Sequence, residues 1–574
     1  MSFSSGVFSI NSAGQPAVAG EVITSAAFNA LTADLANGLS TCLLKDGTQT
    51  VGANIPMAGF KFTGLGGATA TTLTDSLNNS FTQTGTGAVA RAMIGKVQEI
   101  VSVKDFGATG DGTTDDTTDI QDALDATDGV APLYFPPGTY LTQKLTINSN
   151  QFLIGAGVGL TTLKLKNTTN DYLIYGAGSD ALWGTNTDAG ITNWGLRDMT
   201  LDGNLANNAT GLDGIAVYGQ KPIIENVYIK NCKRYGMRTE WYQYGEAVFG
   251  MEGLFRHIVI DTVGQHGWLN NGPHDSHIED VIIIDPSQTT TNTYDGFYVD
   301  TYGAGHFYNV HCWVRASPTA VPRYAINLTG AGSELIGCIA DTGATGNIYI
   351  GPSSTYNLIS ELRCTGARGG KNLIVRGNNN RISGYLAPKN SGTAVVGITL
   401  GTTGGDSVIG NIIDMVCAEQ LGGVIDWTYT GGSNKVTVRG VQASGTSYIG
   451  SPGANDESDI RITGAAEFRL CTKPRFAGIT AAGTVQADAT ALAQGYSLYQ
   501  ISVVAAGTGV RLWTTVQGSE DIMVFNAGAN TLNLFPASGD QINLAGTDNA
   551  VTLASGTGLV LRSLNTTQWY AVGP

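Results

Sequence analysis

The chain has 574 residues, of which 78 are glycine and only 13% are charged, and its formal net charge is −15 at pH 7. This acidic balance argues against nucleic acid and anionic membranes as partners, because a surface that binds phosphate groups needs an excess of Lys and Arg. No apolar run reaches the roughly 18 residues of a spanning helix, and the first residues lack the basic and apolar regions of a secretory signal. The sequence predicts a protein without membrane insertion.

The cysteines lie singly along the chain, without CxxC spacing and without the density of a disulfide scaffold. They are therefore expected to be buried free thiols rather than zinc ligands or disulfides. The seven positions are Cys42, Cys232, Cys312, Cys338, Cys364, Cys417 and Cys471.

Residues 1–95 are rich in small and polar side chains, with one weak helical pattern over 20–40 that Thr24 or Ser25 can cap. The following segment, 43–79, contains DGTQT, NIPM, GFK and TGL in series. It resembles the particle-anchoring segment of phage tail fibres and tailspikes. The resemblance implies that 1–95 attaches the chain to a phage tail or virion adaptor, and that the protein is made in the host cytoplasm.

Residues 96–150 combine DFGATGDGTTDD (105–116) with FPPGTY (135–140). Thr113 or Thr114 can cap a helix over 115–127, which is expected to cover the open end of a first coil. This pairing of motifs resembles the pectate-lyase-like superfamily of β-helical, polysaccharide-active proteins, in which lyases, hydrolases and inactive binders share one fold. Four acids of this segment can serve turns and caps or, alternatively, a calcium loop: Asp105, Asp111, Asp115 and Asp116.

Residues 151–445 repeat a pair of strands, one alternating and one opened by glycine or asparagine, as in 255–263 followed by 267–272 and 278–286 followed by 296–301. A repeat of roughly 23 to 31 residues predicts a solenoid, because each unit buries its apolar row only against its neighbours. The expected fold is all-β, a right-handed parallel β-helix, with a β-sandwich or propeller as the alternative. A polar linker is expected at 446–470.

Residues 471–574 give short alternating strands separated by turns and predict a C-terminal β-sandwich for trimerisation or carbohydrate binding. Trp513, Trp569 and Tyr570 can stack on sugar, although single aromatic residues in strands more often belong to the core.

Side chains alternate across a strand, so equivalent positions of successive coils form columns. Met237, Trp268 and Phe297 are expected to point inward. One outward column then contains Arg238, Leu269 and Tyr298, and the next contains Glu240, Asn271 and Asp300.

Glu240 and Asp300 are the predicted catalytic pair, because two coil spacings of about 4.8 Å suit the roughly 6.5–9.5 Å between the carboxyls of inverting glycosidases. The alternative is that both are ordinary surface acids. Rival catalysts are Glu246 and Glu252 in the insertion 241–253, and His266 and Asp295, whose alternative is turn capping. The predicted substrate-binding residues, largely aromatic, are Arg238, Trp241, Tyr242, Asn271, Tyr298 and Tyr302.

A polysaccharide lyase is the main rival chemistry, because it removes the proton at C5 of a uronic acid with a Tyr or His and neutralises the carboxylate with Arg or Lys. The residues that can serve are Tyr298, Tyr302, His266, His274 and Arg238. The HxxH pair of His274 and His277 has no companion motif, so no metal and no cofactor are expected.

The resemblances together imply a bacteriophage tailspike or tail fibre depolymerase acting on host capsule or O-antigen. The runner-up is a receptor-binding fibre that holds the glycan without cutting it. A homotrimer is expected, because exposed apolar residues in an outward column usually mark an interface. That column contains Tyr228, Val259, Ile282 and His311.

Overall fold

The computed structural model describes residues 2–4, 7–9, 22, 24, 25–40 and 80–574, the last range with short gaps. The gaps are 186, 243–249, 316–319, 369, 388–394, 403–405, 419–422, 443–447, 451–455, 465–467, 473–474, 495, 515–520 and 573–574. The chain divides into two compact units, Met1–Met93 and Ile94–Pro574.

The first unit contains the helix expected over 20–40, here α1 (Ser25–Ser40). The Thr24 hydroxyl accepts a hydrogen bond from the N–H of Ala27 (3.3 Å), so Thr24 caps this helix as predicted. A short antiparallel pair, β1 (Ser2–Ser4) and β2 (Val7–Ser9), precedes it. The segment 43–79, which resembles phage anchors, lies outside the described residues.

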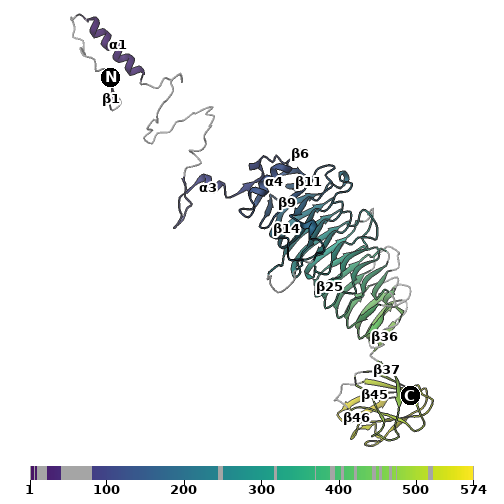
Figure 1. The fold of residues 1–574 in the computed structure, drawn as a ribbon. Coiled ribbons are helices and arrows are strands. Elements are labelled where there is room, and N and C mark those ends of the chain that lie inside the picture. The colour runs from purple at the N-terminus through teal and green to yellow at the C-terminus, as the bar shows by residue number, and fades with distance from the viewer. Residues whose placement is uncertain are drawn as a thin grey trace. The chain divides into compact units, whose positions relative to one another are not determined.

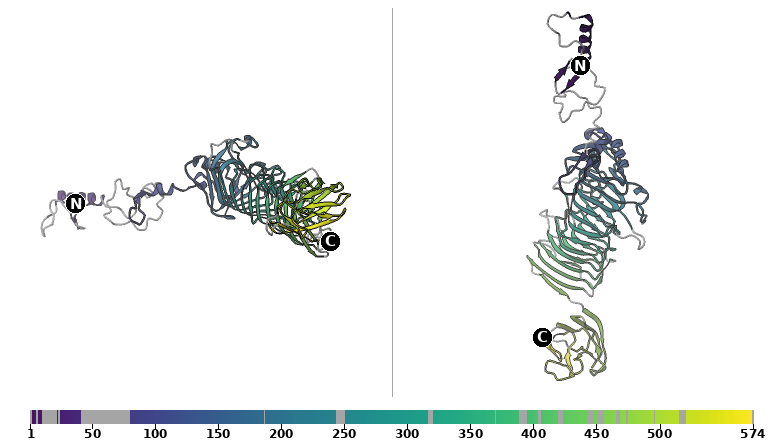
Figure 2. Two further views of the ribbon diagram at one scale, coloured as in Figure 1. Left: turned by 90° about the horizontal axis from the view of Figure 1, so that it is seen from below. Right: turned by 90° about the vertical axis from the view of Figure 1, so that its left-hand side faces the viewer.

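The second unit contains a parallel β-helix, whose stacked coils run from β6 to β36 in Figure 1 and are seen from two further directions in Figure 2. The predicted fold class is thereby confirmed. Two ladders of strands run along it, and β14 (Ile215–Lys230) belongs to both. The short-strand ladder contains β12 (Ile174–Gly176), β15 (Met237–Glu240), β17 (Trp268–Asn271), β19 (Phe297–Val299), β21 (Tyr324–Leu328), β24 (Gly346–Ile350), β26 (Lys371–Val375), β28 (Val396–Leu400) and β31 (Gly423–Trp427). The long-strand ladder contains β11 (Thr161–Leu165), β13 (Ile191–Asp202), β16 (Leu254–Asp261), β18 (Ser276–Ile284), β20 (Gly305–Trp313), β25 (Leu358–Thr365), β27 (Arg381–Ala387), β30 (Ile412–Cys417), β33 (Lys435–Gln442) and β35 (Glu457–Gly464).

The interior is filled by the inward row that the alternation predicts. Met237 pairs with Trp268, and Trp268 with Phe297, and each is at most 1% exposed. The prediction slips by one residue in the coil of β31, where Ile425 rather than Val424 pairs with Ile398. Five of the cysteines are free and buried as expected: Cys232, Cys312, Cys338, Cys364 and Cys417.

In the four successive long strands β14, β16, β18 and β20, a residue in the left-handed backbone conformation occupies the same position, and these residues align between coils. Asn226, His257, Asp280 and Asn309 have φ between 51° and 53°. Asn, Asp and His are the non-glycine residues that most often adopt this conformation, which explains why they occupy this position. The bend separates the strand into two faces.

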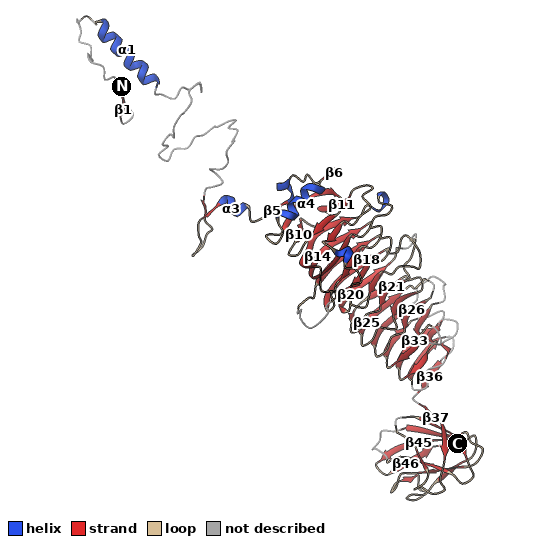
Figure 3. Ribbon diagram, viewed as in Figure 1, coloured by secondary structure: helices blue, strands red, loops and turns tan. Residues whose placement is uncertain are grey.

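The end of the first coils is covered by α4 (Thr117–Ala126), which Figure 3 shows beside the first strands. Its buried residues are Ile120, Ala123 and Leu124, as the sequence predicts. The predicted cap is wrong: the N-cap residue is Asp116 rather than Thr113 or Thr114. Asp116 instead accepts the N–H of Thr109 (2.7 Å) and holds the preceding loop.

A ladder of buried amides replaces apolar packing at one turn of the last coils. The side-chain oxygens of Asn380, Asn411 and Asn434 each accept a hydrogen bond of 2.8–3.0 Å from the Nδ2 of the asparagine in the preceding coil, beginning at Asn357. Asp456 ends the ladder by accepting from Asn434 (3.0 Å). Because buried amides cost free energy unless they are bonded, this ladder fixes the register of the coils.

The predicted linker at 446–470 is instead the last coil of the β-helix. β34 (Tyr448–Gly450) pairs with β31, β35 pairs with β33, and β36 (Phe468–Thr472) turns back antiparallel on β35. Ile460 is fully buried there. The exposed polar residues Glu457 and Arg461 are outward residues of β35, and a search for polar linkers cannot distinguish such residues from a loop.

The C-terminal residues form the expected two-sheet sandwich, with sheet orders β37-β39-β41-β45-β46-β43 and β38-β40-β42-β44. Successive strands alternate between the sheets and pair in parallel up to β42. Trp569 is fully buried in its core, whereas Tyr570 is 37% exposed. The strands are β37 (Arg475–Ala481), β38 (Thr490–Ala491), β39 (Leu498–Val504), β40 (Gly509–Arg511), β41 (Asp521–Asn526), β42 (Leu532–Phe535), β43 (Gln541–Ile542), β44 (Val551–Leu553), β45 (Gly558–Asn565) and β46 (Gln568–Val572).

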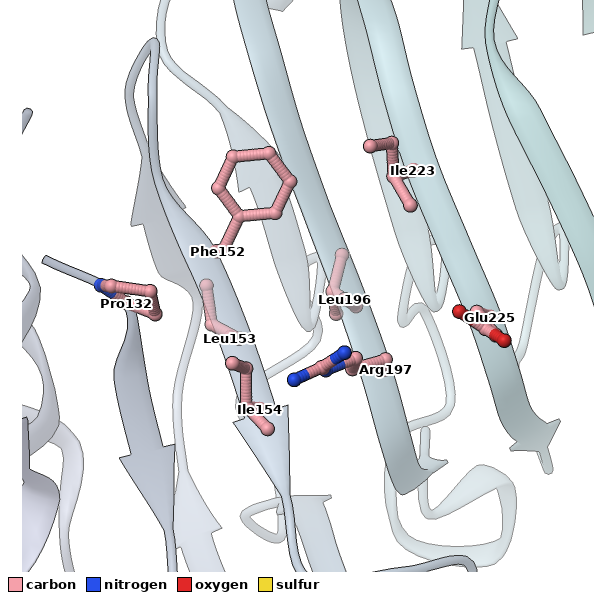
Figure 4. A pocket seen from close by; sticks show the side chains of 8 residues that line it. All are labelled: Pro132, Phe152, Leu153, Ile154, Leu196, Arg197, Ile223 and Glu225. Atoms are coloured by element: carbon pink, nitrogen blue, oxygen red, sulfur yellow. The ribbon is translucent and has the colours of Figure 1, made fainter. Parts of the chain in front are cut away.

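The outer surface of the long-strand ladder carries apolar residues. In the first coils, Phe152 and Ile223 line a groove of about 240 Å³, with Arg197 and Glu225 beside them (Figure 4). Beyond the bend of the long strands, the register places Tyr228, Val259, Ile282 and His311 in one column as predicted, and Ile282 is 37% exposed. Within the described residues, no helix is long and apolar enough to span a membrane.

Candidate functional site

The outer face of β15, β17 and β19 presents the columns that the alternation predicts. Arg238 pairs with Leu269 and Leu269 with Tyr298, while Glu240 pairs with Asn271. The N–H of Asp300, which follows β19, donates to the carbonyl of Asn270 (2.8 Å). Parallel pairing in register brings these polar side chains together on one face.

His266 lies where the chain enters β17, enclosed by three tyrosines. Its ring centroid is 5.3 Å from each of the rings of Tyr235, Tyr294 and Tyr298. The N–H of Asp295 donates to Nδ1 of His266 (2.9 Å), so the proton of the neutral ring is on Nε2. Burial lowers the pKa of His266, which keeps the imidazole uncharged and makes it a hydrogen-bond donor.

Two buried aspartates flank this histidine, and each holds an arginine. Asp213 binds Nε and Nη2 of Arg234 (2.6 and 2.7 Å), and Asp295 binds Nε and Nη2 of Arg323 (3.0 and 2.7 Å). Each acid also accepts a backbone N–H of the next coil, at 3.1 and 3.2 Å. Asp295, a predicted rival catalyst, is therefore a turn-capping and arginine-binding residue with a fully buried side chain.

Glu240 does not face open solvent as predicted. Its residue is 3% exposed, because the segment containing Gly184 covers it and donates an N–H to Oε1 (2.6 Å). Arg238 donates from Nη2 to Oε2 (3.3 Å). The sequence prediction followed the alternation of the strand and could not include a covering segment from residues 182–185.

Arg238 is positioned by two contacts. Its guanidinium lies 3.9 Å from the ring centroid of Trp183, and Glu240 binds one of its amino groups. Its buried Nε has no hydrogen-bond partner within the described residues. Arg238 therefore contains an unpaired donor, and its ring neighbour and its acid fix the side chain.

Trp241, predicted to contact sugar, is instead fully buried in a small apolar cluster with Tyr218 and Met251. Trp241 follows the last residue of β15, and its ring is turned away from solvent. Trp183, which the sequence analysis did not select, supplies the aromatic face at this point.

Asp300 is half-buried and accepts the N–H of Thr301 (2.8 Å). Asn271 accepts the N–H of Tyr302 (3.0 Å), and the ring centroids of Tyr302 and Tyr242 are 4.2 Å apart. The predicted substrate-binding residues thus meet beside Asp300, although Asn271 acts there partly as a support for the backbone.

The phenol of Tyr298 faces both His266 and Asp300. Burial, followed by the negative charge of Asp300, raises the pKa of Tyr298 above its ordinary value of 10. Tyr298 is therefore a protonated phenol at neutral pH, which can donate a proton and cannot act as a base without first losing it.

The remaining predicted residues lie elsewhere. Glu246 is outside the described residues, and Glu252 is exposed. Nδ1 of His274 lies 3.0 Å from its neighbour Asp275, and His277 stacks on His306 at 5.0 Å. In the described ranges, no group of three or more His, Cys, Asp and Glu residues could hold a metal ion.

The arginines beside His266 were missed by the sequence analysis, although a repeated signal marks them. Arg234-Tyr235-Gly236 and Arg323-Tyr324-Ala325 begin two strands of the short-strand ladder in the same way. In each case an Asp-Gly pair stands one coil earlier, 21 and 28 residues before the arginine. A search for an Asp-Gly pair followed one coil later by an Arg-Tyr pair would have identified both ion pairs.

Comparison with known proteins places related sequence over the same coils. Residues 100–304 match the family model of rhamnogalacturonase A/epimerase, pectate lyase-like proteins. Mannuronan C5-epimerase AlgE6 of Azotobacter vinelandii is 32% identical over 220 residues, which are 36% of this chain and 21% of that protein. The chain thus spans about a fifth of the length of this curated relative.

Two further relatives cover shorter stretches. Alginate lyase 7 of Azotobacter vinelandii is 34% identical over 153 residues, or 23% of this chain and 17% of that protein. The preneck appendage protein of Bacillus phage PZA is 31% identical over 138 residues, or 23% of this chain and 15% of that protein. Among solved structures, bacteriophage phi29 gene product 12 aligns with a TM-score of 0.41 and 15% identity, covering 72% of this chain and 63% of that one.

Proposed function

We propose that the chain is a phage tail protein whose β-helix binds an acidic polysaccharide of the host surface and cleaves it by β-elimination. Similarity to a phage appendage protein supports the virion association, and similarity to an alginate lyase and to C5-epimerases supports chemistry on a polysaccharide. The N-terminal anchor and the homotrimer belong to the same proposal. The mass of the purified protein in solution tests the trimer, because a monomeric mass would contradict it.

The observation that carries the proposal is the meeting of Arg238, His266, Tyr298 and Asp300 on one face. Elimination from a uronate needs a cation at the carboxylate, a base for the proton at C5 and an acid for the leaving oxygen at C4. This face offers all three, together with aromatic rings that suit the apolar faces of sugars.

Each residue has one role in the proposed reaction. Arg238 and the Nε2–H of His266 bind the uronate carboxylate and stabilise the negative charge that develops on it. Asp300 accepts the proton from C5, a double bond forms between C4 and C5 as the C4–O bond breaks, and the Tyr298 phenol protonates the departing oxygen. Arg234 and Arg323, both tied to buried acids, hold the surrounding tyrosines in place.

One incubation tests this function. The purified chain is mixed with acidic capsular or O-antigen polysaccharides, and we expect new ultraviolet absorbance from the unsaturated uronate together with new reducing ends. Reducing ends without that absorbance would replace elimination by hydrolysis. Neither signal, with the polysaccharide still bound, would leave the runner-up, a receptor-binding fibre.

Inverting hydrolysis by Glu240 and Asp300 is the second candidate. Their positions in one column, about two coil spacings of 4.8 Å apart, favour it, because inverting enzymes need roughly 6.5–9.5 Å between carboxyls. Water and substrate reach Glu240 in this reaction only when the segment around Gly184 moves aside, since its N–H occupies Oε1. Elimination does not use Glu240 as a catalyst and is therefore preferred.

A further inference from the structure

A polar cavity lies where the long strands β11 and β13 end, and it contains none of the residues assigned to the reaction. Its volume is about 340 Å³, within the roughly 300–1,000 Å³ of small-ligand pockets. The lining residues are Lys164, Asp202, Asn204, Leu205, Ala206 and Asn231. They come from β11, from the end of β13 and from the turns that follow β13 and β14.

The two charged residues that line this cavity, Lys164 and Asp202, form no ion pair with each other. The register places Lys164, Asp202 and Lys230 at adjacent positions of three successive coils. Lys230 lies 3.7 Å from the Asp202 carboxylate, whereas Lys164 forms no ion pair with any described residue. In a chain with a net charge of −15, an unpaired ammonium group beside a cavity is a place for an anion.

The wall around Lys164 is fixed. Oδ1 of Asp202 accepts hydrogen bonds from the N–H of Asn204 (2.9 Å) and from Nδ2 of Asn231 (3.1 Å), and Oδ2 lies 3.7 Å from Nζ of Lys230. Nδ2 of Asn204 donates in turn to the carbonyl of Leu165 (2.9 Å). The cavity therefore keeps its shape without a ligand, which lowers the entropic cost of binding one.

The free groups define the ligand. Lys164 offers a positive charge, the side-chain oxygen of Asn231 accepts no hydrogen bond from a described residue, and Leu205 and Ala206 offer a small apolar surface. A carboxylate, a hydroxyl donor and an apolar ring face together describe one acidic sugar residue.

We propose that this cavity is a second, non-catalytic binding site for an acidic sugar residue, with Lys164 bound to its carboxylate. The choice of an acidic sugar rests on the proposed function, but the site itself does not, because it contains none of the residues assigned to the reaction. A polymer held at two separate faces dissociates more slowly than one held only where it is cut.

Glucuronate is the probe, with glucose as its neutral match, and binding is measured by ligand-observed NMR titration of the full chain. The titration uses an Arg238→Gln background, so that the candidate catalytic face contributes little. We expect glucuronate to bind and glucose not to bind. Lys164→Gln is expected to weaken glucuronate binding at least about tenfold, the effect of losing one charge-assisted contact.

Two matched variants control for charge. Lys164→Arg keeps the positive group and is expected to retain most of the binding, while Lys221→Gln removes the same charge from an exposed residue and is expected to change nothing. Equal glucuronate affinity for Lys164→Gln and its parent would overturn the site, as would equal affinity for glucose. A polysaccharide assay without any cleavage would overturn the proposed function and leave the glucuronate result standing.

Discussion

Replacing Tyr298 by phenylalanine is expected to lower the turnover of an acidic polysaccharide about a hundredfold or more, the low end for loss of acid–base catalysis. The change removes one hydroxyl group and keeps the ring that packs 5.3 Å from His266. In the proposed elimination this hydroxyl protonates the departing oxygen, a transfer made only in the transition state. Initial rates of unsaturated product should therefore show a lower kcat with KM nearly unchanged.

Tyr294→Phe is the matched control. Tyr294 also lies 5.3 Å from His266, and its hydroxyl donates no hydrogen bond to a described residue. Its loss should leave kcat within about threefold of the parent, since only the ring contacts the histidine. A Tyr298→Phe variant that turned over as fast as Tyr294→Phe would remove Tyr298 from the reaction.

The same roles determine the pH dependence of kcat/KM. The acid form of Tyr298 is present below its pKa, and because that pKa is raised above 10, activity should not fall on the alkaline side before pH 10. The neutral form of His266 is present above its pKa, and because that pKa is lowered below 6.5, activity should persist below pH 6.5. An acid limb centred above pH 6.5 would contradict a neutral, buried His266.

The columns of the short-strand face could be predicted from sequence because strand periodicity is exact and parallel coils stack in register. Arg238 and Tyr298 were found in this way, and both face outward beside Leu269. Strand alternation describes only the strands of each coil and leaves out the segments that connect them. It therefore could not foresee that Gly184, from a segment between strands, binds Glu240, nor that Trp241 is buried against Tyr218 and Met251.

The buried ion pairs were harder to predict for another reason. Asp213 and Asp295 precede corner glycines. Turn capping already explains an aspartate at such a position, so the sequence offered no reason to expect an ion pair there. Their arginines stand one coil later in the sequence, so only the stacking of coils brings Nε and Nη2 of each arginine onto its acid. Such pairs can be predicted only when the sequences of two adjacent coils are compared with each other, rather than one motif at a time.

Asp295→Asn is expected to destabilise the β-helix by about 3 kcal/mol, the low end for breaking a buried ion pair. The Asp295 side chain is fully buried and accepts from Nε and Nη2 of Arg323, from a backbone N–H and from Nδ2 of Asn327 (2.8 Å). An amide presents its NH₂ group to some of these donors and leaves Arg323 without a counter-charge. Because the Arg323 side chain is 38% exposed, water compensates part of the loss, which places the effect at the low end.

The shift of the urea unfolding midpoint measures this effect, with Glu225→Gln as the control. Glu225 accepts from Nε and Nη2 of Arg256 (3.0 and 2.6 Å), both on Oε1, and the side chains of Glu225 and Arg256 are 29% and 39% exposed. An exposed pair contributes about 0–1 kcal/mol, so the same acid-to-amide change should barely move the midpoint there. If the two variants unfolded at the same urea concentration, burial would not be what makes the Asp295 pair strong.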